Sequence, residues 1–174
     1  MTGKVSYVEW SGDNDPNALA VLRESGGVIV SPTKVGYIIM TTDAKGLDRK
    51  FDIKDRPRNK PGVVLCSSME QLQTIATLND EILNFYQEHW DRDILLGCIL
   101  PWSENGKKYI PDDGSNEYMM DSRGTSCFVI RFGTPSEKLA SALWQDENRL
   151  SFASSANPSG QGNRGVISGI GTKI

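Results

Sequence analysis

Hydrophobic positions follow two different spacings along the chain. Short runs that contain β-branched residues are typical of buried strands, and apolar residues three or four positions apart between these runs are typical of helices. Because strands alternate with helices, the pattern predicts an α/β fold in which helices cover a sheet. The predicted strands lie at about residues 28–30, 37–42, 62–66, 94–100, 126–132 and 150–155, and the predicted helices at about 16–25, 43–51, 67–78, 79–90 and 135–144.

Two of these segments carry residue types that begin and end helices. Asp15 precedes Pro16, and proline fits the first position of a helix, whereas Gly26-Gly27 is typical of a helix end. Ser67 and Glu70 have the spacing of a capping box. The sequence therefore predicts that one helix begins after Asp15 and that another is capped by Ser67.

Composition agrees with one folded domain. The 174 residues are 38% hydrophobic and 24% charged with a net charge of −3, which excludes a disordered chain. Nothing repeats and no linker divides the chain, so we expect a single domain over residues 1–174, with the glycine-rich tail from about residue 158 left unassigned. The apolar run Ile94–Leu100 is far shorter than the roughly twenty residues of a membrane helix, and residues 1–7 lack the apolar core of a signal peptide. We therefore expect a cytoplasmic protein that does not bind membranes.

The numbers and positions of cysteine and histidine limit which disulfides, metal sites and catalytic groups the chain can form. Cys66, Cys98 and Cys127 are odd in number and far apart, so buried thiols explain them better than disulfides. His89 is the single histidine, and without a Cys-x-x-Cys or a nearby carboxylate motif it does not predict a zinc site. A Ser-His-Asp arrangement would need His89 itself as the base. We interpret His89 as a structural residue at a helix end, where the helix dipole favours a cation.

Positive charge is concentrated in one segment. Residues 45–60 hold seven lysines and arginines against three aspartates, a balance of +4, so the rest of the chain carries −7. An acidic protein with one basic segment is a candidate binder of phosphate or nucleic acid. The alternative is an ordinary solvated helix face. The basic residues of the segment are Lys45, Arg49, Lys50, Lys54, Arg56, Arg58 and Lys60.

Three motif matches have to be weighed against their context. Residues 160–165 fit Gly-x-Gly-x-x-Gly, but only nine residues follow in this sequence, too few for the rest of a dinucleotide-binding unit. Ser31 and Lys34 fit the Ser-x-x-Lys of serine acyl-enzymes, and Ser155–Asn157 loosely fits their second motif, but Lys-Thr-Gly is absent. That acyl-enzyme interpretation stays open as an alternative. The sequence holds no P-loop motif.

The stretch from Lys54 to Pro57 offers a phosphate site. If this chain is extended, Lys54 and Arg56 project to one side, and Pro57 pushes the residue before it toward extended geometry. A lysine and an arginine on one side form a fork that suits a triphosphate, since arginine donates in a planar bidentate geometry. The sequence therefore predicts phosphate contacts from this pair.

A second candidate binding element follows the predicted strand at 150–155. Residues 154–160 read Ser-Ser-Ala-Asn-Pro-Ser-Gly, and small hydroxyl and amide side chains at the carboxyl end of a strand are well placed to contact ligands. The alternative is ordinary turn chemistry, because serine, asparagine, proline and glycine dominate turns.

Taken together and in this order, the two elements resemble the YrdC family, which includes the TsaC-type threonylcarbamoyl-adenylate synthases. The resemblance covers most of the chain and implies a YrdC-like α/β fold, a single-domain twisted open mixed sheet flanked by helices. The matching segments are Gly26–Thr33 with the family's first strand and PT(D/E)TxYG motif, Lys54–Pro57 with Lys60-Pro61 for KxRPxxKP, Trp90 for the start of WPGP, Ile130–Phe132 for VRVP, and Ser155–Gly160 for SANxSG.

This resemblance implies an enzyme that makes threonylcarbamoyl-AMP from threonine, bicarbonate and ATP, for the modification of adenosine 37 in tRNA. Such chemistry depends on positioning and cations more than on a nucleophilic side chain. The resemblance also allows a magnesium ion. It implies that Lys54 and Arg56 are the catalytic phosphate clamp, that Lys60, Ser155 and Asn157 join them in binding ATP, and that Thr33 and Tyr37 line the amino-acid pocket.

Departures from the family pattern fall in the segments that the resemblance assigns to binding of the amino-acid substrate. Lys34 stands where the family has an acidic residue, Val35 where it has a second threonine, and Asp91–Leu95 replaces the segment after Trp90. Lost hydroxyl donors can change specificity by orders of magnitude. Three hypotheses follow: a divergent threonylcarbamoyl-adenylate synthase, a relative that binds nucleotide with another amine or none, and a module that binds double-stranded RNA or tRNA through salt-dependent contacts.

Overall fold

The computed structural model describes residues 7–54, 61–163, 165–170 and 174, and its strands form one six-stranded sheet in the order β1-β2-β6-β3-β5-β4. β3 and β5 are parallel, and every other neighbouring pair is antiparallel, so the sheet is mixed as predicted. The strands are β1 (Ile29–Thr33), β2 (Gly36–Thr41), β3 (Val63–Leu65), β4 (Leu96–Pro101), β5 (Thr125–Ile130) and β6 (Ser151–Ser155).

The described part of the chain contains six α-helices and two short 3-10 helices. The predicted α/β class is confirmed. The sequence pattern did not, however, predict the two short helices between β4 and β5. The helices are α1 (Pro16–Arg23), α2 (Ala44–Lys54), α3 (Met69–Ile75), α4 (Asp80–Asp91), α5 (Asn116–Met119) and α6 (Ser136–Glu147), with η1 (Gly106–Tyr109) and η2 (Ile167–Gly169).

Local hydrogen bonds explain where the helices begin. Asp15 caps α1 by accepting from the backbone N–H of Asn17, as its place before Pro16 predicted. The cap of α3 is Ser68, not Ser67, because the Ser68 hydroxyl accepts from the backbone N–H of Gln71. Ser67 instead donates its own backbone N–H to the Gln71 side chain at 2.8 Å. The predicted helix is therefore correct, but its cap lies one residue later.

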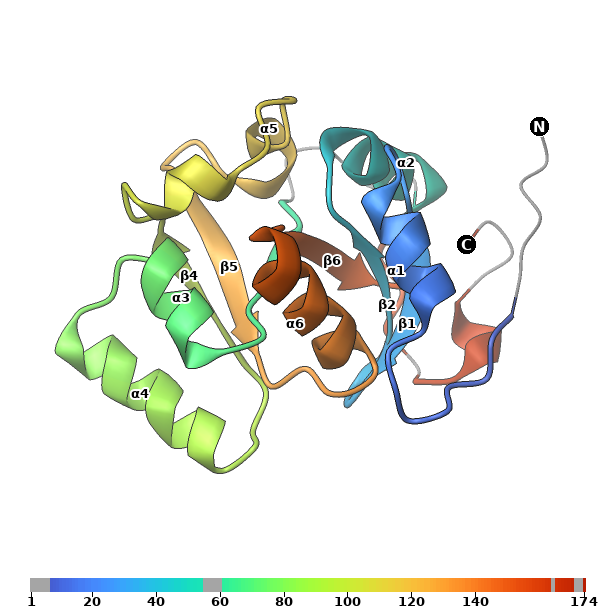
Figure 1. The fold of residues 1–174 in the computed structure, drawn as a ribbon, viewed down its shortest axis with the longest axis horizontal. Helices are drawn as coiled ribbons and strands as arrows, with labels where there is room; N and C mark the ends of the chain where they lie inside the picture. Colours follow the sequence, from blue (N-terminus) through green and yellow to red (C-terminus); the bar gives the residue numbers. More distant parts are fainter. Residues whose placement is uncertain (1–6, 55–60, 164, 171–173) are drawn as a thin grey trace.

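Alternate residues of the central strands belong to two hydrophobic clusters. Phe152 of β6 and Val64 of β3 lie in one cluster, which also holds Tyr86 of α4. Their chain neighbours Ala153 and Leu65 lie in the other cluster, with side chains of α1 and α6. Since successive strand residues point to opposite faces, helices cover both faces of the sheet. Figure 1 shows α1 and α6 side by side in front of the strands β1, β2 and β6.

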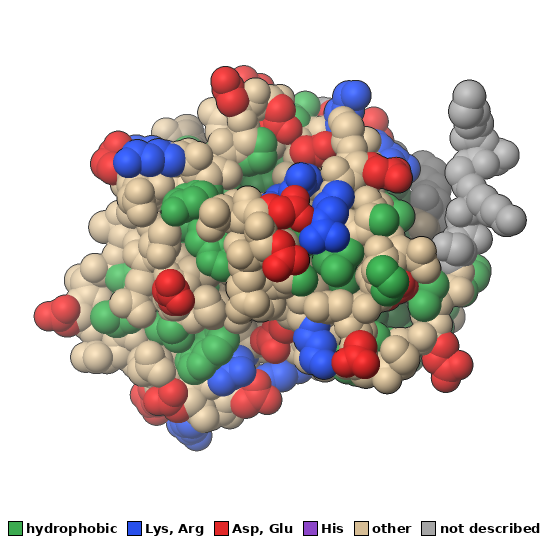
Figure 2. All heavy atoms as spheres, viewed as in Figure 1, with side chains coloured by type: hydrophobic (Ala, Val, Ile, Leu, Met, Phe, Trp, Pro, Cys, Tyr) green, Lys and Arg blue, Asp and Glu red, His purple; other side chains and the backbone are tan. Residues whose placement is uncertain are grey.

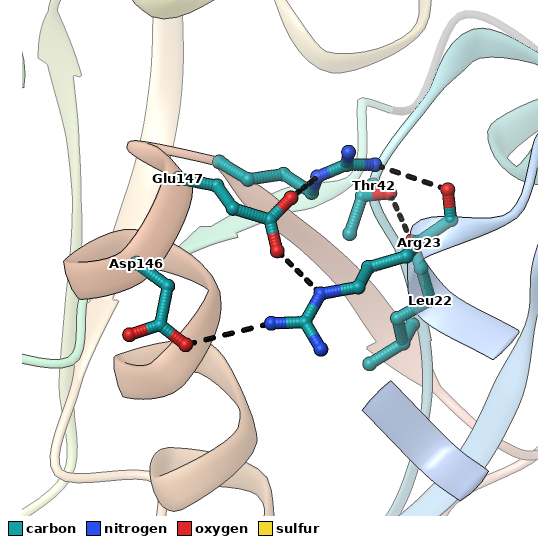
Figure 3. A network of polar contacts seen from close by, with 6 residues as sticks. Leu22, Arg23, Thr42, Asp146 and Glu147 are labelled. Atoms are coloured by element: carbon teal, nitrogen blue, oxygen red, sulfur yellow. Dashed lines mark hydrogen bonds and ion pairs between the residues drawn. The ribbon is translucent and has the colours of Figure 1, made fainter. Parts of the chain in front are cut away.

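An ion network joins α1 to the end of α6. The guanidinium of Arg23 reaches Asp146 at 3.4 Å and also donates to Glu147, and Glu147 accepts from Arg149 at 3.0 Å (Figure 3). Beside it, the Thr42 hydroxyl donates to the backbone oxygen of Leu22 at 2.7 Å. Polar contacts therefore reinforce the packing between these two helices.

The surface mixes both charge signs. Figure 2 shows lysine and arginine side chains interspersed with acidic ones across the face that carries α1 and α6. None of the helices in the described ranges combines the length and apolar character that crossing a membrane requires.

Candidate functional site

Lys54 lies at the carboxyl end of β6. It is the last residue of α2 and only 3% exposed. Its Nζ donates to the backbone oxygen of Ser155 and lies 3.4 Å from Ser155 Oγ and 3.5 Å from Ser154 Oγ. The structure thus brings together two residues that the sequence placed in one ATP site. The predicted extended geometry of Lys54 is wrong, because α2 continues through this residue.

Asn157 follows the carboxyl end of β6, two residues after Ser155. It is 6% exposed, and its Nδ2 donates to the backbone oxygens of Pro158, at 3.1 Å, and of Gln161. Its Oδ1 is buried and finds no hydrogen-bond partner in the described part of the chain. Leaving a buried acceptor unpaired costs roughly 1–3 kcal/mol. Asn157 therefore holds an acceptor that a ligand donor such as a hydroxyl or an amino group could satisfy.

Thr33 and Tyr37 lie on the β1–β2 hairpin, whose turn is Lys34-Val35. The Thr33 hydroxyl donates to the Gly36 carbonyl at 2.6 Å, and the Tyr37 carbonyl accepts from the backbone N–H of Ala156 at 2.8 Å. A hollow of about 420 Å³ is lined by this hairpin, including Thr33 and Tyr37, and by Asn163 and Gly165. The backbone contact with Ala156 attaches the hairpin to the strand end that carries Ser155.

Asn163, which no motif in the sequence indicated, also lines this hollow. Its Nδ2 lies 3.3 Å from the Tyr37 carbonyl, and a Cβ on Gly36 would come within 2.3 Å of its Oδ1. Gly36, with φ of 121°, therefore leaves room for this side chain.

A cluster of charged side chains lies at the tip of the hairpin. Lys34 Nζ is 2.5 Å from Asp93 Oδ1 and donates to the Asp93 carbonyl at 2.6 Å. Arg131 packs its guanidinium 3.7 Å over the ring of Trp90 and donates through Nε to the Trp90 carbonyl at 2.9 Å. The hydrogen bond and charge of Lys34 lower the pKa of Asp93. Two departures from the family pattern, Lys34 and the Asp91–Leu95 segment, are thus in direct contact.

The basic segment does not form one exposed face over its described residues. Lys45 and Arg49 are exposed, whereas Lys50 and Lys54 are buried. Arg49 donates to the Gly26 carbonyl. Two other predicted phosphate contacts, Arg56 and Lys60, lie outside the described residues.

Two alternatives from the sequence can be judged from side-chain contacts. Ser31 is 3% exposed and accepts from the Ser136 hydroxyl at 2.7 Å, while Lys34 binds Asp93, so Ser31 and Lys34 do not form a nucleophile and its base. His89 lies in the last turn of α4, as predicted, with Nδ1 2.8 Å from the Phe85 carbonyl. No three metal-ligating His, Cys, Asp or Glu side chains come together among the described residues.

Comparison with known proteins identifies the family. The model of the Sua5, YciO and YrdC domain, described as telomere recombination, matches residues 21–164. The chain belongs to the Sua5/YciO/YrdC family. No curated protein matched the sequence.

Solved structures agree with this membership. A hypothetical protein from Streptococcus mutans UA159, smu.1377c, shares 53% identity with a TM-score of 0.88 over 95% of this chain. The match spans 64% of that protein, less than two thirds of its length. P. abyssi Sua5, solved in complex with L-threonine, is 24% identical with a TM-score of 0.62, over 88% of this chain and 42% of its own. E. coli YciO is 18% identical with a TM-score of 0.64, over 86% of this chain and 68% of its own. These last two likenesses establish the YrdC-like fold.

Proposed function

We propose that this protein is an ATP-dependent enzyme that joins threonine, bicarbonate and ATP into threonylcarbamoyl-AMP for the modification of tRNA. The observation that carries the proposal is the burial of the Lys54 ammonium against Ser154 and Ser155. A buried ammonium has lost part of its hydration, so it interacts strongly with an incoming anion. Membership of the family and the L-threonine complex of P. abyssi Sua5 support the choice of substrates.

The side chains of Asn157 and Ser155 support the proposal that a nucleotide binds at the carboxyl end of β6. The unpaired Oδ1 of Asn157 can accept from a ribose hydroxyl or a base amino group, and the Ser155 hydroxyl can donate to a phosphate. Lysine carries three donors, so Lys54 can keep its bond to the Ser155 carbonyl while another N–H turns to a phosphate oxygen. Arg56 and Lys60 are proposed as further phosphate contacts.

The reaction has two steps. The threonine nitrogen first attacks carbon dioxide, derived from bicarbonate, and loses a proton to give a carbamate. A carbamate oxygen then bonds to the α-phosphorus of ATP as the bond to the leaving pyrophosphate breaks. Lys54 and Arg56 would stabilise the negative charge that develops on the phosphates. Thr33 and Tyr37 would hold threonine in the hollow beside the hairpin.

A magnesium ion would sit mainly on the phosphates and water, as is usual for this ion. The described residues supply no group of three ligating side chains for it. We therefore assign it no protein cage and no step.

One assay tests the proposal. Protein, ATP, labelled bicarbonate and threonine are incubated, and AMP-linked product and pyrophosphate are measured. We expect both products from the wild type, neither from Lys54→Ala with Arg56→Ala, and unchanged yield from the control Lys107→Ala, whose exposed side chain pairs with Glu104. Product with another amine but not with threonine would show that the enzyme uses that amine as its substrate in place of threonine. Absence of ATP binding together with salt-sensitive RNA binding would overturn the proposal in favour of an RNA-binding module.

A further inference from the structure

Lys34 and Asp93 join the two opposite edges of the sheet. β1 and β4 are its outermost strands; Lys34 follows β1 and Asp93 precedes β4. Their side chains nevertheless form an ion pair of 2.5 Å across 59 positions of sequence. The segments next to the two edge strands therefore meet, although the strands themselves lie at opposite edges of the sheet.

The surrounding contacts fix both partners in place. The backbone N–H of Lys34 donates to the Phe132 carbonyl at 2.9 Å, and a Cβ on Gly133 would come within 2.8 Å of Lys34 Cγ. Arg131 Nε lies 3.7 Å from the same Asp93 oxygen that binds Lys34. Asp93 and Arg131 both adopt φ of 54°, a left-handed conformation that is costly for residues other than glycine. Both residues keep this unfavourable backbone conformation at the point where the Asp93 and Arg131 side chains approach each other.

The hairpin that Lys34 holds also carries Thr33 and Tyr37. Lys34 itself lines the hollow, whereas Asp93 does not. Fixing the turn therefore fixes the wall of the hollow on which the amine substrate is proposed to lie.

We infer that the Lys34–Asp93 pair is a clasp that sets the position of the β1–β2 hairpin and thereby the affinity for the amine substrate. Lys34 and Asp93 act as positioning residues, and the inference rests on the proposed function. The proposed ATP site lies at the carboxyl end of β6, which β2 contacts along the strand, through Ile38 beside Ser155 and through the Tyr37 carbonyl, whereas the clasp holds the turn of the hairpin. Opening the clasp should therefore weaken binding of the amine much more than binding of ATP.

The size of the effect follows from the exposure of the pair. Lys34 is 31% and Asp93 63% exposed, and such pairs contribute little to overall stability. A displacement of about 1 Å in a positioned substrate can nevertheless cost up to roughly a hundredfold in rate. We expect the KM for the amine to rise about tenfold with little change in Tm.

The test uses Asp93→Asn, Lys34→Met, their double variant and Lys34→Arg, with Glu104→Gln, from the exposed Lys107–Glu104 pair, as control. Lys34→Met should raise the amine KM more than Asp93→Asn, because it also removes the hydrogen bond to the Asp93 carbonyl, and the double variant should add little to the effect of Lys34→Met. Lys34→Arg should restore most of the affinity, since arginine keeps the ion pair. The KM for ATP should change far less than the KM for the amine in every variant.

Hydrogen exchange provides a readout that does not depend on turnover. The backbone N–H groups of Lys34 and Val35 should exchange faster in Asp93→Asn than in the wild type or in Glu104→Gln. Unchanged exchange would overturn the clasp whatever the activity. Faster exchange with an unchanged amine KM would overturn the positioning role. Absence of product from the wild type with every amine would refute the proposed function, and the exchange experiment would still decide whether the clasp exists.

Discussion

The ammonium of Lys54 lies 3.4 Å from the Ser155 hydroxyl, although the two residues are 101 positions apart. The contact joins the end of α2 to the end of β6, the two segments that carry the family's basic and serine-asparagine motifs. A cation and a hydroxyl that meet at a strand end have the chemistry of the proposed phosphate contact. The pair is therefore the first place to test nucleotide binding.

Lys54→Met should weaken ATP binding by about tenfold to a hundredfold, because hydrogen bonds to charged groups contribute roughly 1.5–3 kcal/mol. Methionine fills similar space, so the fold should persist. Calorimetric titration with ATP measures the affinity, and circular dichroism checks the fold. Lys107→Met, at an exposed site, should bind ATP like the wild type. Equal ATP affinities for the two variants would show that Lys54 does not contribute to ATP binding.

Tyr86→Phe should destabilise the core. The Tyr86 hydroxyl is buried, donates to the Phe128 carbonyl at 2.7 Å and accepts from the Cys98 N–H at 3.0 Å. Removing it takes one hydrogen bond from each of two backbone groups inside the fold, at a cost of about 1–3 kcal/mol. Urea unfolding measures the difference. Tyr109→Phe, whose hydroxyl makes no hydrogen bond within the described ranges, should change stability by less, and the reverse order would contradict the packing described for Tyr86.

The ion network of Figure 3 predicts a pH dependence. The hydrogen bond from Arg23, aided by the charges of Arg149 and Arg23, lowers the pKa of Glu147 in the folded protein. A lowered folded pKa stabilises the fold above the unfolded value of about 4.3. That contribution disappears as the pH falls through the folded pKa.

Glu147→Gln should therefore lower the free energy of unfolding at pH 7 by about 0.2–1 kcal/mol, the usual range for a partly exposed pair. The difference from the wild type should shrink as the pH falls through the lowered folded pKa of Glu147 and the carboxylate becomes protonated. Urea titrations at several pH values follow this difference. A difference that stayed constant with pH would show that the charge of Glu147 does not stabilise the contact between α1 and α6.

Thiol reactivity should separate the cysteines. Cys66 is fully buried, and burial raises its pKa far above the ordinary thiol value. Burial also raises the pKa of Cys127, which is less deeply buried. Iodoacetamide at pH 8 should therefore leave Cys66 unmodified in the native protein and alkylate it after denaturation, because the thiolate is the nucleophile. Mass spectrometry of peptides locates the label, and rapid native labelling of Cys66 would contradict its burial.

The sequence predicted the fold class and most helices and strands, because caps and hydrophobic periodicity act over a few residues. Asp15 caps the helix that follows it, as predicted. The errors were also local. The helix α2 runs to Lys54, past the predicted end near residue 51, and Ser68 rather than Ser67 caps α3. Neighbouring serines offer equivalent caps, and only the observed hydrogen bond to Gln71 distinguishes them.

The sequence by itself determined the α/β pattern, the family motifs and the candidate residues Lys54, Ser155 and Asn157. Only the tertiary structure decided the strand order, the fold of Asn163 over Gly36, and the pairing of Lys34 with Asp93. Lys34 and Asp93 looked like separate departures in sequence. Their contact depends on how the connecting segments beside the two sheet edges pack together in three dimensions, which no spacing within either segment encodes. Long-range contacts of this kind are fixed by packing and register together.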